Sequence, residues 1–268
     1  MGAKMDYIKF LGTGGARFVV SKQIRSSGGI WCNFKGKNLL IDPGPGALVR
    51  CLSSKPKLDP EDLDAIILTH KHLDHSSDAN VLIEAMTGGR VRKEGVVYAP
   101  SDAVYSKEPA IHKYLRDSVE KLEILKEQNS YSLGNLDFIT SVIHRHSVET
   151  YGLKFTLDRG KISFITDTYF FPELINHYKS EVIVINVVLY KHPGYDNVKH
   201  LDLEDCKRLI TGIKPRVAIL THFGLTMLKN KPWILAEKLT EETGVEVIAA
   251  YDGMTLCLED YLFFNKIQ

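Results

Sequence analysis

The sequence has no long apolar segment, no strong excess of charge of either sign and no closely spaced pair of cysteines. No apolar run approaches the length of a membrane span. Charged residues at positions 4, 6 and 9 interrupt the apolar region that a signal peptide would need. The formal net charge of +1 indicates no general attraction to nucleic acid or membranes. We therefore expect a soluble protein of the cytoplasm.

The cysteines do not form a CxxC motif, and their neighbours are mostly apolar or typical of helices. Such cysteines are expected to be reduced packing residues, which fits a cytosolic compartment. They are Cys32, Cys51, Cys206 and Cys257. Proline and glycine are spread along the chain, so there is no collagen-like or low-complexity tract.

The chain is long enough to bury a sizeable core, because it has 268 residues of which 44% are hydrophobic and 25% charged. Length alone allows one large domain or two small ones. No linker-like change of composition appears, and both halves alternate strand-like and helix-like segments. Two strand-rich halves that each carry helices predict two sheets packed face to face with helices outside.

Three histidines and an aspartate lie within six residues, at His70, His72, Asp74 and His75. They follow residues 64–68, a short apolar run that predicts a buried strand. Ligand sites collect at the carboxyl ends of such strands, and imidazole and carboxylate groups suit zinc or a similar ion. Four donors on so short a loop exceed what one tetrahedral ion can take. We expect His70 and His72 to bind one ion and Asp74 and His75 another, the alternative being a polar surface loop.

The spacing His-x-His-x-Asp-His resembles the hallmark of the metallo-β-lactamase-fold hydrolases. The opening residues Phe-Leu-Gly-Thr-Gly-Gly at 10–15 also resemble the phosphodiesterase branch, which includes the tRNA 3′-processing nucleases. The resemblance covers nearly the whole chain. It implies an α/β fold, the αββα four-layer sandwich of two facing mixed β-sheets with helices outside. We predict a single domain spanning residues 1–268.

The resemblance also implies the remaining metal donors, which follow further predicted strands. His146 resembles the third histidine motif, and His144 is the competing candidate on the same strand. Asp167 resembles the carboxylate that bridges two ions, and His222 resembles the last histidine. The implied cofactor is a pair of divalent ions, zinc with manganese or iron as alternatives. One ion is held by His70, His72 and His146, the other by Asp74, His75 and His222, with Asp167 between them.

Two residues are candidates for catalytic roles beside the ions. Asp74 would orient the attacking hydroxide that such a dinuclear centre generates at neutral pH. His200 precedes the predicted helix 203–210 and resembles in position a histidine that acts near the leaving group or phosphate in the phosphodiesterase branch. It would be either the general acid or a phosphate ligand, and a surface histidine at a helix entry is the alternative. Asp42 is interpreted as a structural neighbour of the site or as a turn residue.

Three local interpretations accompany these assignments. The glycines at 12–15 predict a tight loop rather than a phosphate-binding turn, because residues 16–20 do not make a convincing helix. Residues 107–115 are expected to be helical. No inserted Gly- or Lys-rich arm is visible, and residues 185–188 lack the His-Glu-Ala-Thr-type motif of the tRNA-processing branch.

The sequence therefore predicts a metal-dependent hydrolase, with a phosphodiesterase acting on a small or nucleotide-like phosphodiester as the leading function. Hydrolysis of another ester, such as a lactone or thioester, is the first alternative. An RNA-processing nuclease and a non-catalytic RNA-binding protein of the same fold are less favoured. Nucleic acid is a disfavoured partner, no membrane partner is expected, and the oligomeric state is left open.

Overall fold

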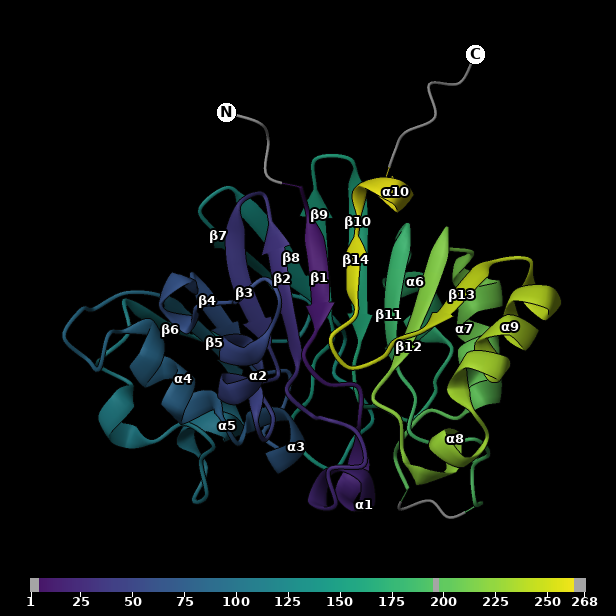
Figure 1. The fold of residues 1–268 in the computed structure, drawn as a ribbon, viewed down its shortest axis with the longest axis horizontal. Helices are drawn as coiled ribbons and strands as arrows, with labels where there is room; N and C mark the ends of the chain where they lie inside the picture. The colour runs from purple at the N-terminus through teal and green to yellow at the C-terminus, as the bar shows by residue number, and fades with distance from the viewer. Residues whose placement is uncertain (1–4, 195–197, 263–268) are drawn as a thin grey trace.

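The computed structural model describes residues 5–194 and 198–262, which form four layers with two β-sheets inside and helices outside (Figure 1). Each sheet has seven strands, and each combines parallel and antiparallel pairs. The predicted αββα sandwich of mixed sheets is therefore confirmed. Both ends of the predicted domain, residues 1 and 268, lie outside the described residues.

The first sheet has the order β14-β1-β2-β3-β4-β5-β6. Strands β3 to β6 run parallel, and β14, β1, β2 and β3 pair antiparallel. The strands are β1 (Tyr7–Phe10), β2 (Ile30–Phe34), β3 (Lys37–Ile41), β4 (Ala65–Ile67), β5 (Val96–Pro100), β6 (Lys121–Leu125) and β14 (Thr255–Cys257).

The second sheet repeats this plan with the order β13-β12-β11-β10-β9-β8-β7. Strands β10 to β13 are parallel, and β7 to β10 are antiparallel neighbours. The strands are β7 (Ser130–Leu133), β8 (Leu136–Thr140), β9 (Leu153–Leu157), β10 (Gly160–Ile165), β11 (Val182–Asn186), β12 (Val217–Thr221) and β13 (Glu246–Ala249).

The two sheets enclose one apolar layer because alternate residues of each strand face inward. Ile8 and Phe10 of β1 are fully buried in this layer together with Phe155 of the second sheet. The rings of Phe34 and Phe155 meet across it edge to face, with centroids 5.2 Å apart. Burial of such large rings from both sheets is what holds the sandwich together.

Helices cover the outer face of each sheet (Figure 1). On the first sheet α4 buries Leu82, Ile83 and Met86, the apolar stripe that its sequence predicts. On the second sheet α7 begins at a capping box in which Asp202 accepts from the backbone N–H of Asp205. The helices are α1 (Ala16–Ser21), α2 (Ala47–Ser53), α3 (Leu73–Ser76), α4 (Ala79–Met86), α5 (Ser101–Tyr105), α6 (Glu173–His177), α7 (Leu203–Ile213), α8 (Leu225–Lys229), α9 (Pro232–Thr243) and α10 (Glu259–Leu262). Among the described residues, no helix is long and apolar enough to cross a membrane.

Two local predictions are wrong. Residues 16–21 do form a short helix, α1, which starts at Ala16 in a left-handed conformation that propensity does not indicate. The helix expected over 107–115 is reduced to one 3-10 turn, η2 (Lys113–Leu115). The apolar Ile111 and Leu115 are nevertheless buried against the outer face of the first sheet, so tertiary packing satisfies them without a helix.

The parallel strands bring several loops to one edge of the sandwich. Strands β1, β3 and β4 of the first sheet and β8, β10 and β12 of the second end there. In Figure 1 this is the lower edge, where α1 and α3 lie near the line between the sheets. Side chains that follow these strands can therefore converge on one place.

Candidate metal centre

The predicted donors follow the carboxyl ends of four strands that meet at this edge. His70 comes after β4, His146 after β8, Asp167 after β10 and His222 directly after β12. Among the described residues, two groups of three place their ligand atoms within 4.8 Å of one another and match the two predicted sets. They are His70, His72 and His146, and Asp74, His75 and His222.

In the first group the free ring nitrogens point at one another. His146 Nε2 lies 3.1 Å from His72 Nδ1. The other nitrogen of His146, Nδ1, donates to the Lys199 carbonyl at 3.0 Å, which leaves Nε2 with a lone pair. His70 Nε2 is buried and has no hydrogen-bond partner among the described residues. A buried imidazole nitrogen without a partner is costly unless a ligand occupies its lone pair.

The second group is built in the same way. His75 Nε2 lies 3.3 Å from His222 Nε2. Asp74 Oδ2 is 3.6 Å from His222 Nε2 and 3.8 Å from His75 Nε2. The other nitrogen of His75, Nδ1, is engaged with Asp42 Oδ2 at 2.9 Å, so its Nε2 also faces the group.

Asp167 lies against the second group and beside His200. Its Oδ1 is 3.4 Å from His222 Nε2, and its Oδ2 is 3.7 Å from His75 Nε2 and 3.4 Å from His200 Nδ1. Only 3% of the residue is exposed. A buried carboxylate is stable only where positive charge or donors surround it, and the histidines provide such surroundings.

The spacing of the ring nitrogens fits a shared ion in each group. Zinc binds imidazole nitrogen at about 2.0–2.1 Å, so two nitrogens at tetrahedral angles lie about 3.3 Å apart. The observed separations are 3.1 Å for His72 and His146 and 3.3 Å for His75 and His222. The donor sets therefore fit two divalent ions.

Charge in the site follows burial and proximity. Burial lowers the pKa values of His70, His72 and His146, so these imidazoles are neutral and able to bind a metal. Burial would also lower the pKa of His75, but the carboxylates of Asp74, Asp42 and Asp167 outweigh it and raise that pKa. Burial opposes ionisation of Asp167, yet His222 and His75 hold its pKa well below the usual range.

Asp42 contacts the site without facing both groups. Its Oδ1 accepts from the Thr69 backbone N–H at 2.7 Å, and its Oδ2 accepts from the Thr69 hydroxyl and contacts His75 Nδ1. These contacts orient His75, the structural role proposed for Asp42 from the sequence. The carboxylate also forms a third close group with His70 and His75.

Three residues of the site have left-handed backbone conformations that non-glycine residues rarely adopt. Asp42 has φ 52°, His222 has φ 59° and Ala16 has φ 61°. The N–H of Ala16 donates to Asp74 Oδ2 at 3.2 Å. Such strain persists only where surrounding contacts over-determine the backbone, and it collects at functional sites.

His144, the competing third histidine, faces away from both groups. Its Nε2 contacts the Tyr178 hydroxyl at 2.6 Å, and its Nδ1 contacts the Asp167 carbonyl at 3.1 Å. Burial lowers its pKa to about 3, so it is neutral. One ring nitrogen contacts the Asp167 carbonyl and the other the Tyr178 hydroxyl, so neither is left for a metal.

His200 reaches the site from the segment before α7. Its ring packs edge to face on His146, with centroids 5.2 Å apart, and its buried Nδ1 has no hydrogen-bond partner among the described residues. Burial lowers its pKa. The ring therefore lies beside Asp167 at the edge of the site, with 22% of the side chain exposed.

Asn186 is a site residue whose role the sequence did not indicate. It ends β11, and its Nδ2 donates to Asp167 Oδ1 at 2.9 Å. In the sequence, residues 185–188 are notable only because an acid motif is missing there. A polar residue ending an otherwise apolar strand was the available signal.

A substitution at Gly15 should disturb His222 specifically. A Cβ at this position would lie 2.3 Å from His222 Cδ2 and 2.4 Å from its Nε2. We expect Gly15→Ala to push the imidazole aside and to lower the metal content, measured by elemental analysis of purified protein. Gly36→Ala is the control, because it strains a left-handed glycine that has no atom within 4 Å of the added Cβ. Equal metal content in both variants would contradict the expectation.

Comparison with known proteins identifies the family. The model of the beta-lactamase superfamily domain matches residues 37–223, which covers the donor loops from His70 to His222. The chain belongs to this superfamily and has the metallo-β-lactamase fold. Together with the grouped donors, the family indicates a metal-dependent hydrolase.

Relatives and solved structures align with nearly the whole chain. The protein is 31% identical over 256 residues to the uncharacterized protein MJ1374 of Methanocaldococcus jannaschii, covering 92% of this chain and 93% of that one. It is 23% identical to a ribonuclease Z of Borrelia garinii subsp. bavariensis, covering 93% and 96%. The crystal structure of the metallo-beta-lactamase fold protein YhfI from Bacillus subtilis superposes with a TM-score of 0.76 at 17% identity, covering 94% and 99%.

Proposed function

We propose that the protein is a phosphodiesterase that uses two divalent ions, zinc in the first place, to hydrolyse a small or nucleotide-like phosphodiester. The observation that carries the proposal is the pairing of ring nitrogens at 3.1 and 3.3 Å in two groups, with a buried carboxylate beside them. Histidine nitrogens held this close with their other nitrogens engaged are typical of a metal site.

In this proposal, the first ion is held by His70, His72 and His146. The second is held by Asp74, His75 and His222, and Asp167 supplies the negative charge between them. When bound, two such ions lower the pKa of a water molecule and stabilise charge that develops on a phosphoryl oxygen. Asp42, Lys199 and Asn186 orient the donors through the hydrogen bonds described above.

Two protein groups would act on the substrate itself. Asp74 Oδ2 accepts a hydrogen bond from the Ala16 N–H and lies beside both His75 and His222. The other carboxylate oxygen, Oδ1, can therefore orient the attacking water. His200 would donate a proton to the leaving oxygen. Its side chain is 22% exposed, so a substrate in the site can reach it.

A ribonuclease Z among the relatives favours one second candidate, an RNA-processing nuclease. That alignment runs over 317 positions, more than the 268 residues of this chain, so the relative carries inserted residues that this chain lacks. The shorter chain and the missing acid motif at 185–188 favour a smaller substrate. Hydrolysis of a lactone or thioester by the same centre is the remaining alternative.

The proposal is tested by measuring the turnover of several substrates with protein whose metal content is known. We expect close to two equivalents of divalent metal per chain and hydrolysis of a generic phosphodiester well above that of a phosphomonoester, a lactone or a structured RNA. Removing the metal with a chelator should abolish turnover, and restoring it should recover turnover. Faster turnover of the lactone or RNA would replace the proposed substrate class. Metal content well under one equivalent, with none taken up on titration, would count against the centre itself.

A further inference from the structure

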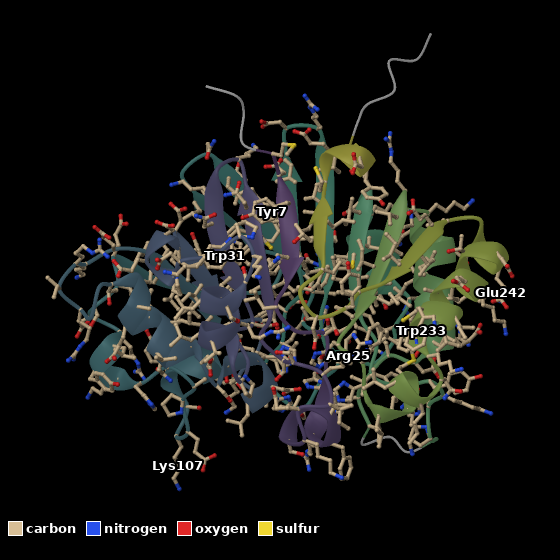
Figure 2. The ribbon with its side chains drawn as sticks, viewed as in Figure 1. Tyr7, Arg25, Trp31, Lys107, Trp233 and Glu242 are labelled. Atoms are coloured by element: carbon tan, nitrogen blue, oxygen red, sulfur yellow. The ribbon has the colours of Figure 1, made fainter. Side chains whose placement is uncertain are left out.

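A cavity lies on the outer face of the first sheet, away from the apolar layer between the two sheets. It has a volume of about 250 Å³ and is lined by Lys9, Leu11, Arg50, Ser53, Ser54, Lys55 and Gly253. Lys9 lies two residues after Tyr7, which Figure 2 labels on β1, so both side chains are on the outer face of that strand. The cavity is therefore separate from the metal centre at the strand ends.

The lining carries three cations and no carboxylate. Among the described residues, no carboxylate oxygen lies within 4.0 Å of the Lys9, Arg50 or Lys55 charged groups. Like charges that line one cavity repel one another, and no carboxylate in the lining offsets them. The electrostatic complement of this cavity is an anion.

The ammonium of Lys9 is buried without a negatively charged partner in the described part of the chain, which is energetically unfavourable. Only 5% of the residue is exposed, and its ammonium donates to the carbonyls of Lys55 and Gly253 and to the Thr255 hydroxyl. Burial lowers its pKa. A lysine this buried is normally paired with a carboxylate, because neutral acceptors alone compensate its desolvation poorly. Here, among the described residues, the charge has only these neutral acceptors, and Lys9 is part of the cavity lining.

Arg50 and Lys55 supply the donors. The Arg50 Nε–H donates to the Leu11 carbonyl at 3.0 Å, which fixes the guanidinium plane. Among the described residues, the Arg50 guanidinium makes no other hydrogen bond or ion pair, and the Lys55 ammonium makes none. A guanidinium held in one plane with free N–H groups matches the oxygens of a phosphate group. The cavity lies just below the usual range of about 300–1,000 Å³ for ligand pockets, which suits a small anion.

We propose that this cavity is a binding site for a phosphate group, held by Arg50 and Lys55 in the positive field of Lys9. The site is independent of the metal centre and of the reaction proposed for it. Free phosphate and the phosphoryl group of a mononucleotide share the chemistry that the site recognises. The cavity needs neither metal nor turnover to bind either of them.

The test measures phosphate binding to the metal-loaded full-length protein by calorimetry and by backbone amide NMR. Inorganic phosphate should shift the amides of Ser54 and Gly253, and its affinity should fall as salt rises. Lys55→Gln and Arg50→Gln should each weaken this binding by about tenfold or more, the effect of losing a hydrogen bond to a charged group. Lys57→Gln is the matched control, because Lys57 lies two residues away and pairs with Asp59 at 3.0 Å.

Binding of adenosine 5′-monophosphate and of adenosine distinguishes free phosphate from a phosphorylated nucleoside as the ligand. Equal affinity for phosphate and the monophosphate identifies free phosphate as sufficient, and tighter binding of the monophosphate identifies a larger phosphorylated ligand. Either result supports the site if Lys55→Gln weakens ligand binding and Lys57→Gln leaves it unchanged. Phosphate shifts confined to the metal centre, equal binding in Lys55→Gln and the unaltered protein, or adenosine binding as tightly as its monophosphate would each overturn the proposal. Because the Lys55 side chain is exposed, its variant remains a valid test if Arg50→Gln does not fold.

Discussion

Asp167→Asn is expected to abolish phosphodiester turnover and to lower the affinity for divalent metal by at least about a hundredfold. The substitution keeps the size of the side chain and removes the negative charge that lies beside His75, His222 and His200. Two cations a few ångströms apart repel each other strongly unless negative charge lies between them. Changing even a residue that only orients a metal ligand costs about 10–100-fold in metal affinity, so a direct donor should cost more.

Elemental analysis and turnover on the same samples measure both effects. Asp158→Asn is the matched control, because Asp158 is on the hairpin between β9 and β10 with 79% of its side chain exposed. It should keep full metal content and rate, since its surface pair with Lys35 contributes little. Two firmly bound equivalents in Asp167→Asn would show that this carboxylate does not bridge the ions.

His200→Ala is expected to lower the rate on an alkyl or nucleotide diester by about 10²–10⁴-fold, the usual contribution of a positioned general acid. An alkoxide leaving group needs a proton as it departs. An aryloxide such as nitrophenolate is stable as an anion, so the same variant should keep substantial activity on an activated aryl diester. Both metals should remain, because His200 belongs to neither group of three donors.

The experiment measures the hydrolysis rate of each variant on the two diesters and the metal content of each sample. His112→Ala is the control histidine, because His112 is exposed and its ring stacks on Tyr114. Similar losses on both substrates would instead assign His200 to phosphate binding. No loss on either substrate would remove His200 from the mechanism and weaken the phosphodiesterase proposal.

Much of the fold was predictable because its signals are local. Apolar runs such as 65–67 and 217–220 predict buried strands from a few consecutive residues. The same holds for the helix α4, since its apolar stripe repeats within eight residues. The segment 107–115 was mispredicted because burial of Ile111 and Leu115 imposes the same apolar pattern without a helix.

The metal donors were equally predictable from the sequence. Four of them lie in one loop, and the remaining three each follow a strand. Which donors face one another depends on contacts between distant segments. His144 and His146 are two residues apart, yet Tyr178 and the Asp167 carbonyl engage one while the Lys199 carbonyl orients the other.

The sequence by itself determined the fold class and the types of donor available at the strand ends, since both depend on short-range patterns of polarity. Only the tertiary structure decided that Asn186 holds Asp167 and that His200 packs on His146. It also decided that Lys9 reaches the carbonyl of Gly253, 244 residues away, in a cavity without a carboxylate. The physical reason is that a side chain's charge state and free lone pairs are set by its neighbours in space, and strand pairing brings those neighbours together from remote parts of the chain.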